Sequence, residues 1–403
     1  MSLSFKQKLE DSIPEYCYGK DRIEVIEKVI DSKPIHDEIY REIEKLLIKM
    51  LEEEASDMNI GGYRSRGYVW LRVYGDNVPM EEFGTYSVDE VAAILISLLS
   101  DEHKEQLYRD KSVDFAFSVD IPGYDQDFRF RSNIYFERKI LVANFRLIKQ
   151  ELFKIKKLGF PAKIIQRLDW EHEKSGLIMV TGITGAGKSS TLDSIIDMNN
   201  QKNRSHITII GNPVEYLHKS RQSLVTHREV GTDVPSFHKG TIQALRQDPD
   251  IIVVGEMRDA KTISTVLEVT DSGHKVFTTL HTHSAVESIS RIIAQFPPNE
   301  QERIRYRLAD TLQIVISQKL VPNRRHTLTL AKEILSMNES IKAAIRNNHL
   351  GEIFQMLTEG RKEGMFTMQQ NLHFLVRKGI ITPQTAMDYA NNKKIMKQLL
   401  KYT

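Results

Sequence analysis

One short stretch, GITGAGKSS, constrains the fold of this chain more than any other. It matches the pattern G-x-x-x-x-G-K-[ST] from Gly182 to Ser189, which is typical of a loop whose backbone N–H groups surround a phosphate. The apolar run LIMVT precedes the loop and a helical pattern, STLDSIIDMN, follows it, so the positive end of a helix would add to the site. The stretch therefore predicts a nucleotide-binding P-loop domain.

The side chains of this loop suit ATP and Mg²⁺, which we predict as cofactors. Lys188 can reach the β- and γ-oxygens of the nucleotide, and the Ser189 hydroxyl can be a metal ligand for magnesium. The predicted nucleotide-binding residues are Gly182, Ile183, Thr184, Gly185, Ala186, Gly187, Lys188, Ser189 and Ser190.

Short continuous apolar runs (LIMVTG, ITII, IIVVGE and KVFTTL) alternate with helical stretches between about residues 160 and 335. Strands that are buried on both faces of a parallel sheet have this pattern. We therefore predict an α/β fold with a parallel-rich central sheet for this part of the chain.

Two of these strands are predicted to end in residues that suit catalysis. In DPDIIVVGEMRD, Glu256 follows a β-branched run, at the edge of the sheet where ligands bind, and could orient or deprotonate the water that attacks the γ-phosphate. Asp250 stands before that strand and is expected to be a cap or turn residue. In GHKVFTTLHTHSA, His281 could hydrogen-bond the γ-phosphate. Structural histidines or a zinc site with His283 are the alternatives, although no third zinc ligand is evident.

A further strand, in HITIIGNPVEYLH, ends without an acid. The Asn212 amide can hydrogen-bond a water or a metal-bound water, whereas Gly211 cannot. We therefore expect Glu215, or a residue from elsewhere, to take any acidic role at this strand end.

The rest of the chain predicts three other regions. Residues 34–148 combine an amphipathic helix with alternating strands and should form a small α+β domain, joined by a linker at 149–160 to the P-loop domain at 161–335. Residues 336–403 should form a helical tail. Residues 1–33 are poorly periodic and are predicted to be an extension of uncertain order.

Composition narrows the partners and the compartment. The 56 basic and 54 acidic residues give a net charge of +2, which argues against a nucleic-acid partner. The one cysteine, Cys17, excludes a disulfide within the chain and favours a reducing compartment. No apolar run approaches the roughly 20 residues that span a bilayer, so we expect a cytoplasmic protein with no direct membrane insertion.

In this order, the motifs resemble those of the secretion-type ATPases of type II secretion, type IV secretion and type IV pili. GITGAGKSS is similar to the family's Walker A box, DPDIIVVGEMRD to its Walker B box and SGHKVFTTLHTHSAVESISRII to its His box. ITIIGNPVEYLH stands where the family has its Asp box, but Gly211 and Asn212 replace the usual Glu-Asp before proline. EASDMNIGG and LRVYGD resemble the start of the family's PAS-like N-terminal domain.

The resemblance implies a RecA-like P-loop domain, preceded by a PAS-like α+β domain and followed by a helical tail. It implies a ring of six copies of the chain, with ATP between the two domains. Glu256 would be the catalytic glutamate, and His281 the His-box residue, supported by His274. Arg131 and Arg146 match the family's phosphate-facing, catalytic arginines, and an arginine can clamp a γ-phosphate with two hydrogen bonds. Arg138 is a further candidate.

Within the family, the sequence favours a motor for type IV pilus retraction. The stretches FPPNEQERIRYRLADTLQIVISQKLVP and AAIRNN resemble the retraction motors, and the single cysteine excludes the four-cysteine zinc motif of many extension and secretion members. We therefore expect a hexameric ATPase that couples hydrolysis to pilus disassembly and twitching motility. Its partner would be the inner-membrane pilus platform protein, which would bring it to that membrane.

Other functions stay open at this point. One alternative is a motor for type IV secretion, pilus assembly or type II secretion. An alternative of another class is a nucleotide-gated regulator of a second motor that hydrolyses ATP weakly or not at all, for which the altered Asp box is the reason.

Overall fold

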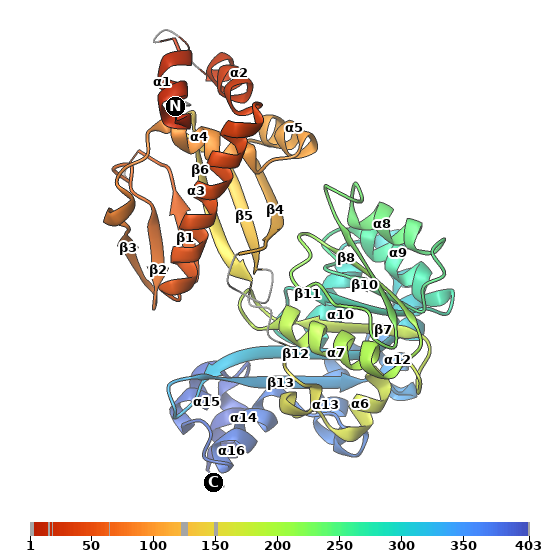
Figure 1. Cartoon of the computed structure of the whole chain (residues 1–403). Coiled ribbons are helices and arrows are strands. Elements are labelled where there is room, and N and C mark those ends of the chain that lie inside the picture. Colours follow the sequence, from red (N-terminus) through yellow and green to blue (C-terminus); the bar gives the residue numbers. More distant parts are fainter. Residues whose placement is uncertain are drawn as a thin grey trace. The chain divides into compact units, whose positions relative to one another are not determined.

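The computed structural model describes residues 4–14, 17, 19–63, 65–121, 128–148 and 152–401. The chain divides into two compact units, which we call unit 1 (residues 1–150) and unit 2 (residues 151–403) (Figure 1). None of the helices in the described residues is long and apolar enough to cross a membrane.

Unit 1 contains one antiparallel sheet and five α-helices within its described residues. The sheet has the order β3-β2-β1-β6-β5-β4. Helix α4 packs on β6, α5 packs beside β4, and α1, α2 and α3 pack against α4. The elements are α1 (Phe5–Ser12), α2 (Gly19–Ile30), α3 (Lys33–Glu52), β1 (Asp57–Ile60), β2 (Trp70–Val73), β3 (Asp76–Pro79), η1 (Glu81–Phe83), α4 (Val88–Ser97), α5 (Asp101–Asp110), β4 (Ser112–Val119), β5 (Phe128–Glu137) and β6 (Ile140–Ile148).

Local sequence patterns explain the helices of unit 1. The amphipathic helix predicted in residues 34–148 is α3, which buries one apolar face between Ile35 and Met50. Ser87 caps α4, and the Glu90 carboxylate accepts a hydrogen bond from the Ser87 backbone, which completes a capping box. The segment of uncertain order forms α1 and α2, whose apolar residues join the core of unit 1.

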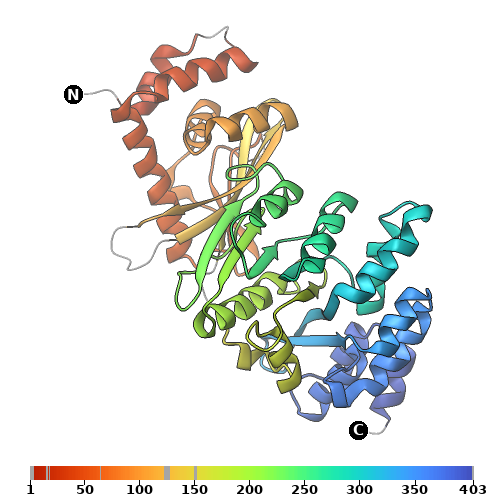
Figure 2. The same cartoon turned by 90° about the vertical axis from the view of Figure 1, so that its right-hand side faces the viewer.

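Unit 2 contains a seven-stranded sheet with helices on both faces (Figure 1 and Figure 2). The elements are η2 (Ile155–Leu158), α6 (Ala162–Leu168), β7 (Gly176–Thr181), α7 (Lys188–Lys202), β8 (His206–Gly211), β9 (Leu224–Glu229), α8 (Phe237–Ala244), β10 (Ile251–Val254), α9 (Ala260–Asp271), β11 (Lys275–Leu280), α10 (Ala285–Ala294), α11 (Pro298–Thr311), β12 (Leu312–Pro322), β13 (Leu328–Ser336), α12 (Glu339–Arg346), η3 (Leu350–Glu352), α13 (Ile353–Glu359), η4 (Gly360–Glu363), α14 (Met368–Arg377), α15 (Pro383–Tyr389) and α16 (Lys393–Leu400).

The sheet of unit 2 is mostly parallel, with the order β13-β12-β7-β11-β10-β8-β9. Only the β12–β13 pair is antiparallel among its ladders. Strands β7, β10 and β11 are buried along their whole length, as the continuous apolar runs predict. Because the strands are parallel, the loops that follow β7, β8, β10 and β11 leave the same edge of the sheet.

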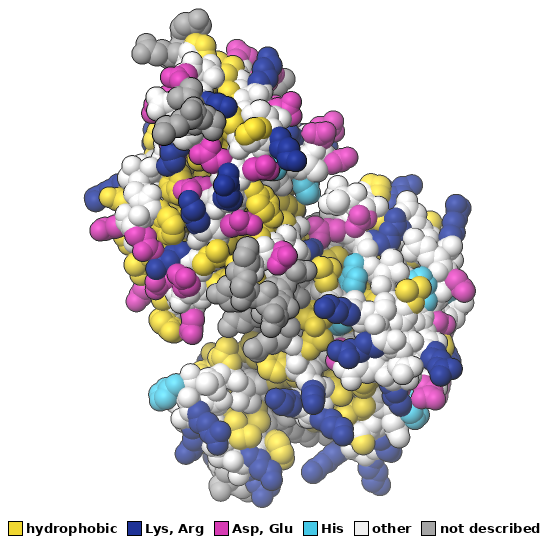
Figure 3. Space-filling view, viewed as in Figure 1, with side chains coloured by type: hydrophobic (Ala, Val, Ile, Leu, Met, Phe, Trp, Pro, Cys, Tyr) yellow, Lys and Arg dark blue, Asp and Glu magenta, His cyan; other side chains and the backbone are white. Residues whose placement is uncertain are grey.

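The C-terminal helices of unit 2 pack at the β12–β13 edge of its sheet. Helices α14 to α16 form a small separate core with residues of β12 and β13. Lysine and arginine side chains gather over these helices on the face shown in Figure 3.

The predicted linker includes Phe160, which is buried in the core beside α6. The predicted domain boundaries stay predictions.

Candidate active site

The phosphate loop joins β7 to α7, and its glycines are favoured by a close approach at Gly182 and by a positive φ at Gly185. At Gly182, a Cβ atom would lie 2.6 Å from the carbonyl oxygen of Gln318 on β12, so any side chain would displace the loop. Gly185 has a φ of +78°, and nothing lies within 4 Å of the place where its Cβ would stand. The loop therefore offers open space beside its backbone, which fits a bound phosphate.

Lys188 begins α7 and turns back over the loop. Its Nζ donates to the carbonyl oxygens of Gly182, at 2.9 Å, and Ile183, at 3.1 Å. Burial lowers the pKa of Lys188, and the negative charges of Glu256 and Glu215 oppose this shift. Two carboxylates therefore act electrostatically on the P-loop lysine, one from the end of β10 and one from the loop after β8.

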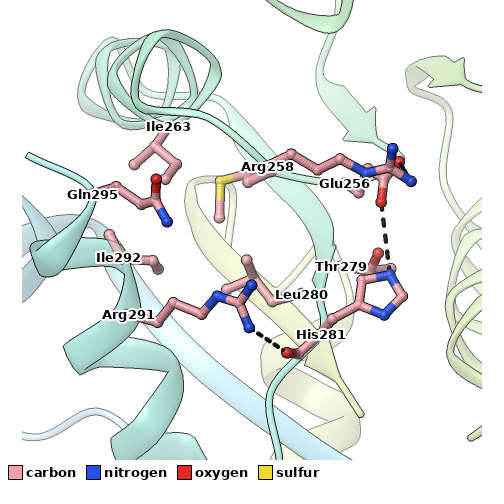
Figure 4. A pocket seen from close by; sticks show the side chains of 10 residues that line it. Glu256, Arg258, Ile263, Thr279, Leu280, His281, Arg291, Ile292 and Gln295 are labelled. Atoms are coloured by element: carbon pink, nitrogen blue, oxygen red, sulfur yellow. Dashed lines mark hydrogen bonds and ion pairs between the residues drawn. The ribbon is translucent and has the colours of Figure 1, made fainter. Parts of the chain in front are cut away.

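Glu256 lies between the side chains of Arg258 and His281 at the end of β10. Its Oε1 is 2.6 Å from Nη2 of Arg258, and its Oε2 is 3.7 Å from Nε2 of His281 (Figure 4). Thr279 joins the two strand ends, because its hydroxyl donates to the carbonyl oxygen of Gly255 at 2.6 Å. Only 12% of the Glu256 side chain is exposed, so its carboxylate has a restricted range of positions.

His281 follows β11 and is fixed through its backbone. Nη1 of Arg291, on α10, donates to the His281 carbonyl oxygen at 2.8 Å (Figure 4). Burial lowers the pKa of His281, and the positive charge of Lys188 adds to this shift. The imidazole is therefore mainly neutral at pH 7. A pocket of about 310 Å³ lies beside Glu256 and His281 and is also lined by Arg258 and Arg291.

The end of β8 has a tight turn where the family's acids are replaced. A Cβ at Gly211 would lie 2.9 Å from the Cα of Val214, whereas Asn212 is exposed. The N–H of Val214 donates to the Glu229 carboxylate at 3.1 Å, which fastens the loop to β9. Glu215 follows in this loop and is half-buried.

The other predicted residues of the P-loop unit do not all meet at this edge. His274 precedes β11 and therefore lies at the opposite end of that strand from His281; its Nδ1 is 3.0 Å from the Ser272 hydroxyl. Asp250 accepts a hydrogen bond from the His206 N–H at 2.8 Å, before β10, as expected for a turn residue. His281 and His283 both follow β11, so they do not share a strand face. Among the described residues no group of three histidine, cysteine or acidic side chains is arranged to hold a metal ion.

The predicted arginines lie in unit 1, where Arg131 on β5 and Arg146 on β6 are direct cross-strand neighbours. Each arginine side chain donates a hydrogen bond to an aspartate. Nε of Arg131 donates to Asp114 at 3.0 Å, and Nε of Arg146 donates to Asp57 at 2.8 Å. Arg138 lies at the other end of this hairpin, in the β5–β6 turn.

Three residues of this site were missed by the reasoning from sequence. Arg258 stands two residues after Glu256 in the predicted motif, so its charge could have been noticed. Arg291 lies in the helix after His281, within the quoted His-box stretch, whereas Gln318 comes from an element far along the chain. Nε2 of Gln318 donates to the carbonyl oxygen of Ala186 at 2.7 Å, a contact that depends on β12 lying next to β7.

Comparisons with known proteins agree with this geometry. Residues 33–392 match the family described as "Type II/IV secretion system protein". The chain is 36% identical over 331 residues to a twitching motility protein of Neisseria gonorrhoeae, with 81% of this chain and 85% of that protein covered. It is 34% identical over 354 residues to the type IV pilus retraction ATPase PilT of Pseudomonas aeruginosa, with 87% and 98% covered.

A solved structure gives the same result for the fold. The crystal structure of the pilus retraction motor PilT with bound ADP has a TM-score of 0.78 and 36% identity, and the match covers 88% of this chain and 99% of that chain. The predicted α/β fold with a RecA-like domain is thereby confirmed, while the PAS-like assignment of unit 1 stays a prediction. The chain binds a nucleotide, and it belongs to the type II/IV secretion system protein family.

Proposed function

We propose that this chain is an ATP-hydrolysing motor that drives type IV pilus retraction. The observation that carries the proposal is the juxtaposition of Lys188, Glu256 and His281 at one edge of a parallel sheet. This arrangement occurs in a chain with more than a third of its aligned residues identical to a twitching motility protein. A P-loop that only binds nucleotide has no chemical need for a carboxylate and an imidazole at this place.

The site residues suggest a division of roles for hydrolysis. The N–H groups of the loop and Lys188 bind the β- and γ-phosphates, and Glu256 orients the attacking water and accepts its proton. His281, as a neutral imidazole, can donate one hydrogen bond to the γ-phosphate. Arg131 and Arg146 clamp the γ-phosphate. Ser189 would hold Mg²⁺, which neutralises charge on the phosphates when bound.

A motor of this kind also needs partners. We propose that six copies of the chain form a ring, and that this ring acts in the cytoplasm on the inner-membrane platform protein of the pilus. Sedimentation velocity tests the ring, because the hexamer should have six times the 46.5 kDa mass of one chain. A chain that stays monomeric with ATP present would contradict this part of the proposal.

The second candidate is a regulator that binds ATP without turning it over, and the altered end of β8 favours it. ATP hydrolysis separates the two. Wild-type protein with Mg²⁺ and ATP should release phosphate, and Glu256→Gln should abolish release while ATP still binds. Glu302→Gln is the matched control, because Glu302 is exposed on α11, outside the candidate site. Wild-type release no faster than that of Glu256→Gln would favour the regulator.

The direction of the motor is tested in cells. Deletion of the gene should leave more pili that no longer shorten, if the protein retracts them. Fewer pili would indicate an assembly motor, and normal pili with loss of effector transfer would indicate a type IV secretion motor.

A further inference from the structure

The loop that carries Glu215 is held mainly by the far end of α7 and by β9. The Asn200 side chain accepts from the Arg221 N–H at 3.0 Å and donates to the Lys219 carbonyl oxygen at 2.9 Å. On the other side, the His218 N–H donates to Nε2 of His227 on β9 at 3.0 Å. These contacts fix the second half of the loop, but they lie away from the phosphate loop.

One contact ties the loop to the first turns of α7. Nε2 of His218 lies 3.1 Å from Oδ1 of Asp193, and the His218 side chain is only 1% exposed. Asp193 is four residues after Ser189 on α7, so both residues lie on the same face of the helix, one turn apart. The buried pair therefore joins the loop after β8 to the helix turn next to the phosphate loop.

The charge of Glu215 acts on this pair. Burial raises the pKa of Asp193; the hydrogen bond from His218 opposes this shift, and the charge of Glu215 adds to it. The negative charge of Glu215 also opposes the lowering of the Lys188 pKa. The charge of Glu215 therefore affects both Asp193 and Lys188. Glu215 stands three residues before His218, the partner of Asp193.

We propose that Asp193 and His218 are positioning residues that hold Glu215 at the nucleotide site. The inference rests on the proposed function, because the position of Glu215 affects turnover only in a chain that hydrolyses ATP. With glycine and asparagine at the end of β8, Glu215 is the acid of this loop whose charge acts on Lys188. The Asp193–His218 contact fixes that acid relative to the phosphate loop.

A double-variant cycle tests the proposal in the full-length protein. Asp193→Ala should lower kcat by about 10- to 100-fold, the cost of misplacing a reacting group by about an ångström, with little change in KM. Asp193→Asn should keep most of the turnover, because its amide oxygen can still accept from His218. Combined with Glu215→Gln, Asp193→Ala should cause no further loss in single-turnover hydrolysis of radiolabelled ATP.

Asp197→Ala is the matched control. Asp197 lies one turn further along α7, and its carboxylate accepts from Gln201 of the same helix. This variant should turn over ATP like the wild type. An Asp193→Ala loss that persists in full beside Glu215→Gln would show that Asp193 does not act through Glu215, and would overturn the proposal.

Hydrogen exchange separates this inference from the proposed function. Backbone amides of residues 214–222 should exchange faster in Asp193→Ala but not in Asp197→Ala. If the wild type does not exceed Glu256→Gln in turnover, the proposed function fails, and exchange alone decides whether the contact holds the loop. Unchanged exchange in Asp193→Ala would overturn the positioning role whatever the turnover.

Discussion

At the level of single residues, the missing acid at Gly211 has a steric explanation. A Cβ at this position would lie 2.9 Å from the Cα of Val214 and 3.0 Å from the carbonyl oxygen of Pro213. Both neighbours are backbone atoms of the next turn, so they cannot rotate away as a flexible side chain can. The loop after β8 turns back so closely that a side chain is excluded, and an acid can enter only at a later position.

Substitution of Gly211 should therefore damage the site. Gly211→Ala should destabilise unit 2 by about 1–3 kcal/mol, as overpacking does, and should lower phosphate release because Glu215 shifts with the loop. Asn212→Asp is the control, since Asn212 is exposed and its substitution should change stability by less than about 0.5 kcal/mol. Urea denaturation and phosphate release measure the two effects. If Gly211→Ala changes neither the free energy of unfolding nor phosphate release, the steric explanation is wrong.

The residues that could be predicted are those whose role depends on the next few positions in the chain. Lys188 follows from the phosphate-loop pattern, and Glu256 and His281 follow from the rule that parallel strands end at one edge. Gln318 could not be predicted in the same way. Its hydrogen bond to Ala186 joins residues 132 positions apart, and only the order of strands in the sheet brings them together.

At the level of elements, the buried start of β11 anchors the region before β7. Nζ of Lys275 donates to the carbonyl oxygens of Arg167 and Glu173, both at 2.7 Å, and of Asp169 at 3.3 Å. The side chain is fully buried, and burial lowers the pKa of Lys275 to about 8. An apolar run alone predicts the strand, but nothing in it reveals that its first residue ties down the end of α6.

Lys275 should make stability depend on pH in a defined direction. The ordinary lysine pKa is about 10.4, so from about pH 8 to about pH 10 the unfolded chain keeps a proton that the folded chain has lost. The free energy of unfolding of the wild type, relative to Lys275→Met, should therefore rise with pH across this window. At pH 7, Lys275→Met should be less stable by about 1–3 kcal/mol, because it leaves buried carbonyl oxygens without a donor.

The two tryptophans allow this measurement on unit 2 alone. Trp70 belongs to unit 1 and Trp170 to unit 2, so a Trp70→Phe background leaves Trp170 fluorescence as the reporter of unit 2 in urea. The difference in free energy of unfolding between the wild type and Lys275→Met should rise between about pH 8 and pH 10. If this difference stays constant or falls, Lys275 does not release its proton there.

The N-terminal helices show the limit of pattern reasoning for elements. In α2, Ile23, Ile26 and Ile30 have helical spacing and are buried, and in α1 Phe5 and Leu9 are four residues apart. Each pattern is too short to predict an element by itself. The helices are stabilised by packing against α3 and α4, and sequence periodicity contains no information on which surface receives them.

At the level of the whole molecule, the proposed catalytic groups are divided between two compact units. Lys188, Glu256 and His281 belong to unit 2, while Arg131 and Arg146 are adjacent in the sheet of unit 1. The proposed clamp residues are therefore not among the residues of the phosphate loop, and their substitution tests the clamp separately from nucleotide binding.

The arginines should therefore matter for turnover more than for binding. Arg131→Ala and Arg146→Ala should each lower kcat by about a thousandfold, the lower end for an arginine that stabilises transferring phosphate, while ATP affinity changes little. The ion pair of Arg131 with Asp114 is partly exposed and contributes only about 0–1 kcal/mol. Asp57 is buried, so Arg146→Ala should cost about 1–3 kcal/mol of stability, and both variants should stay folded. Arg109→Ala is the matched control, because Arg109 is an exposed arginine of unit 1 whose acid partner is its neighbour Asp110. Phosphate release and binding of a fluorescent ATP analogue separate the two effects, and urea denaturation checks the fold. Normal turnover in either variant would exclude that arginine from the clamp, and an equal loss of affinity and turnover would mean that it binds ATP without acting on the transition state.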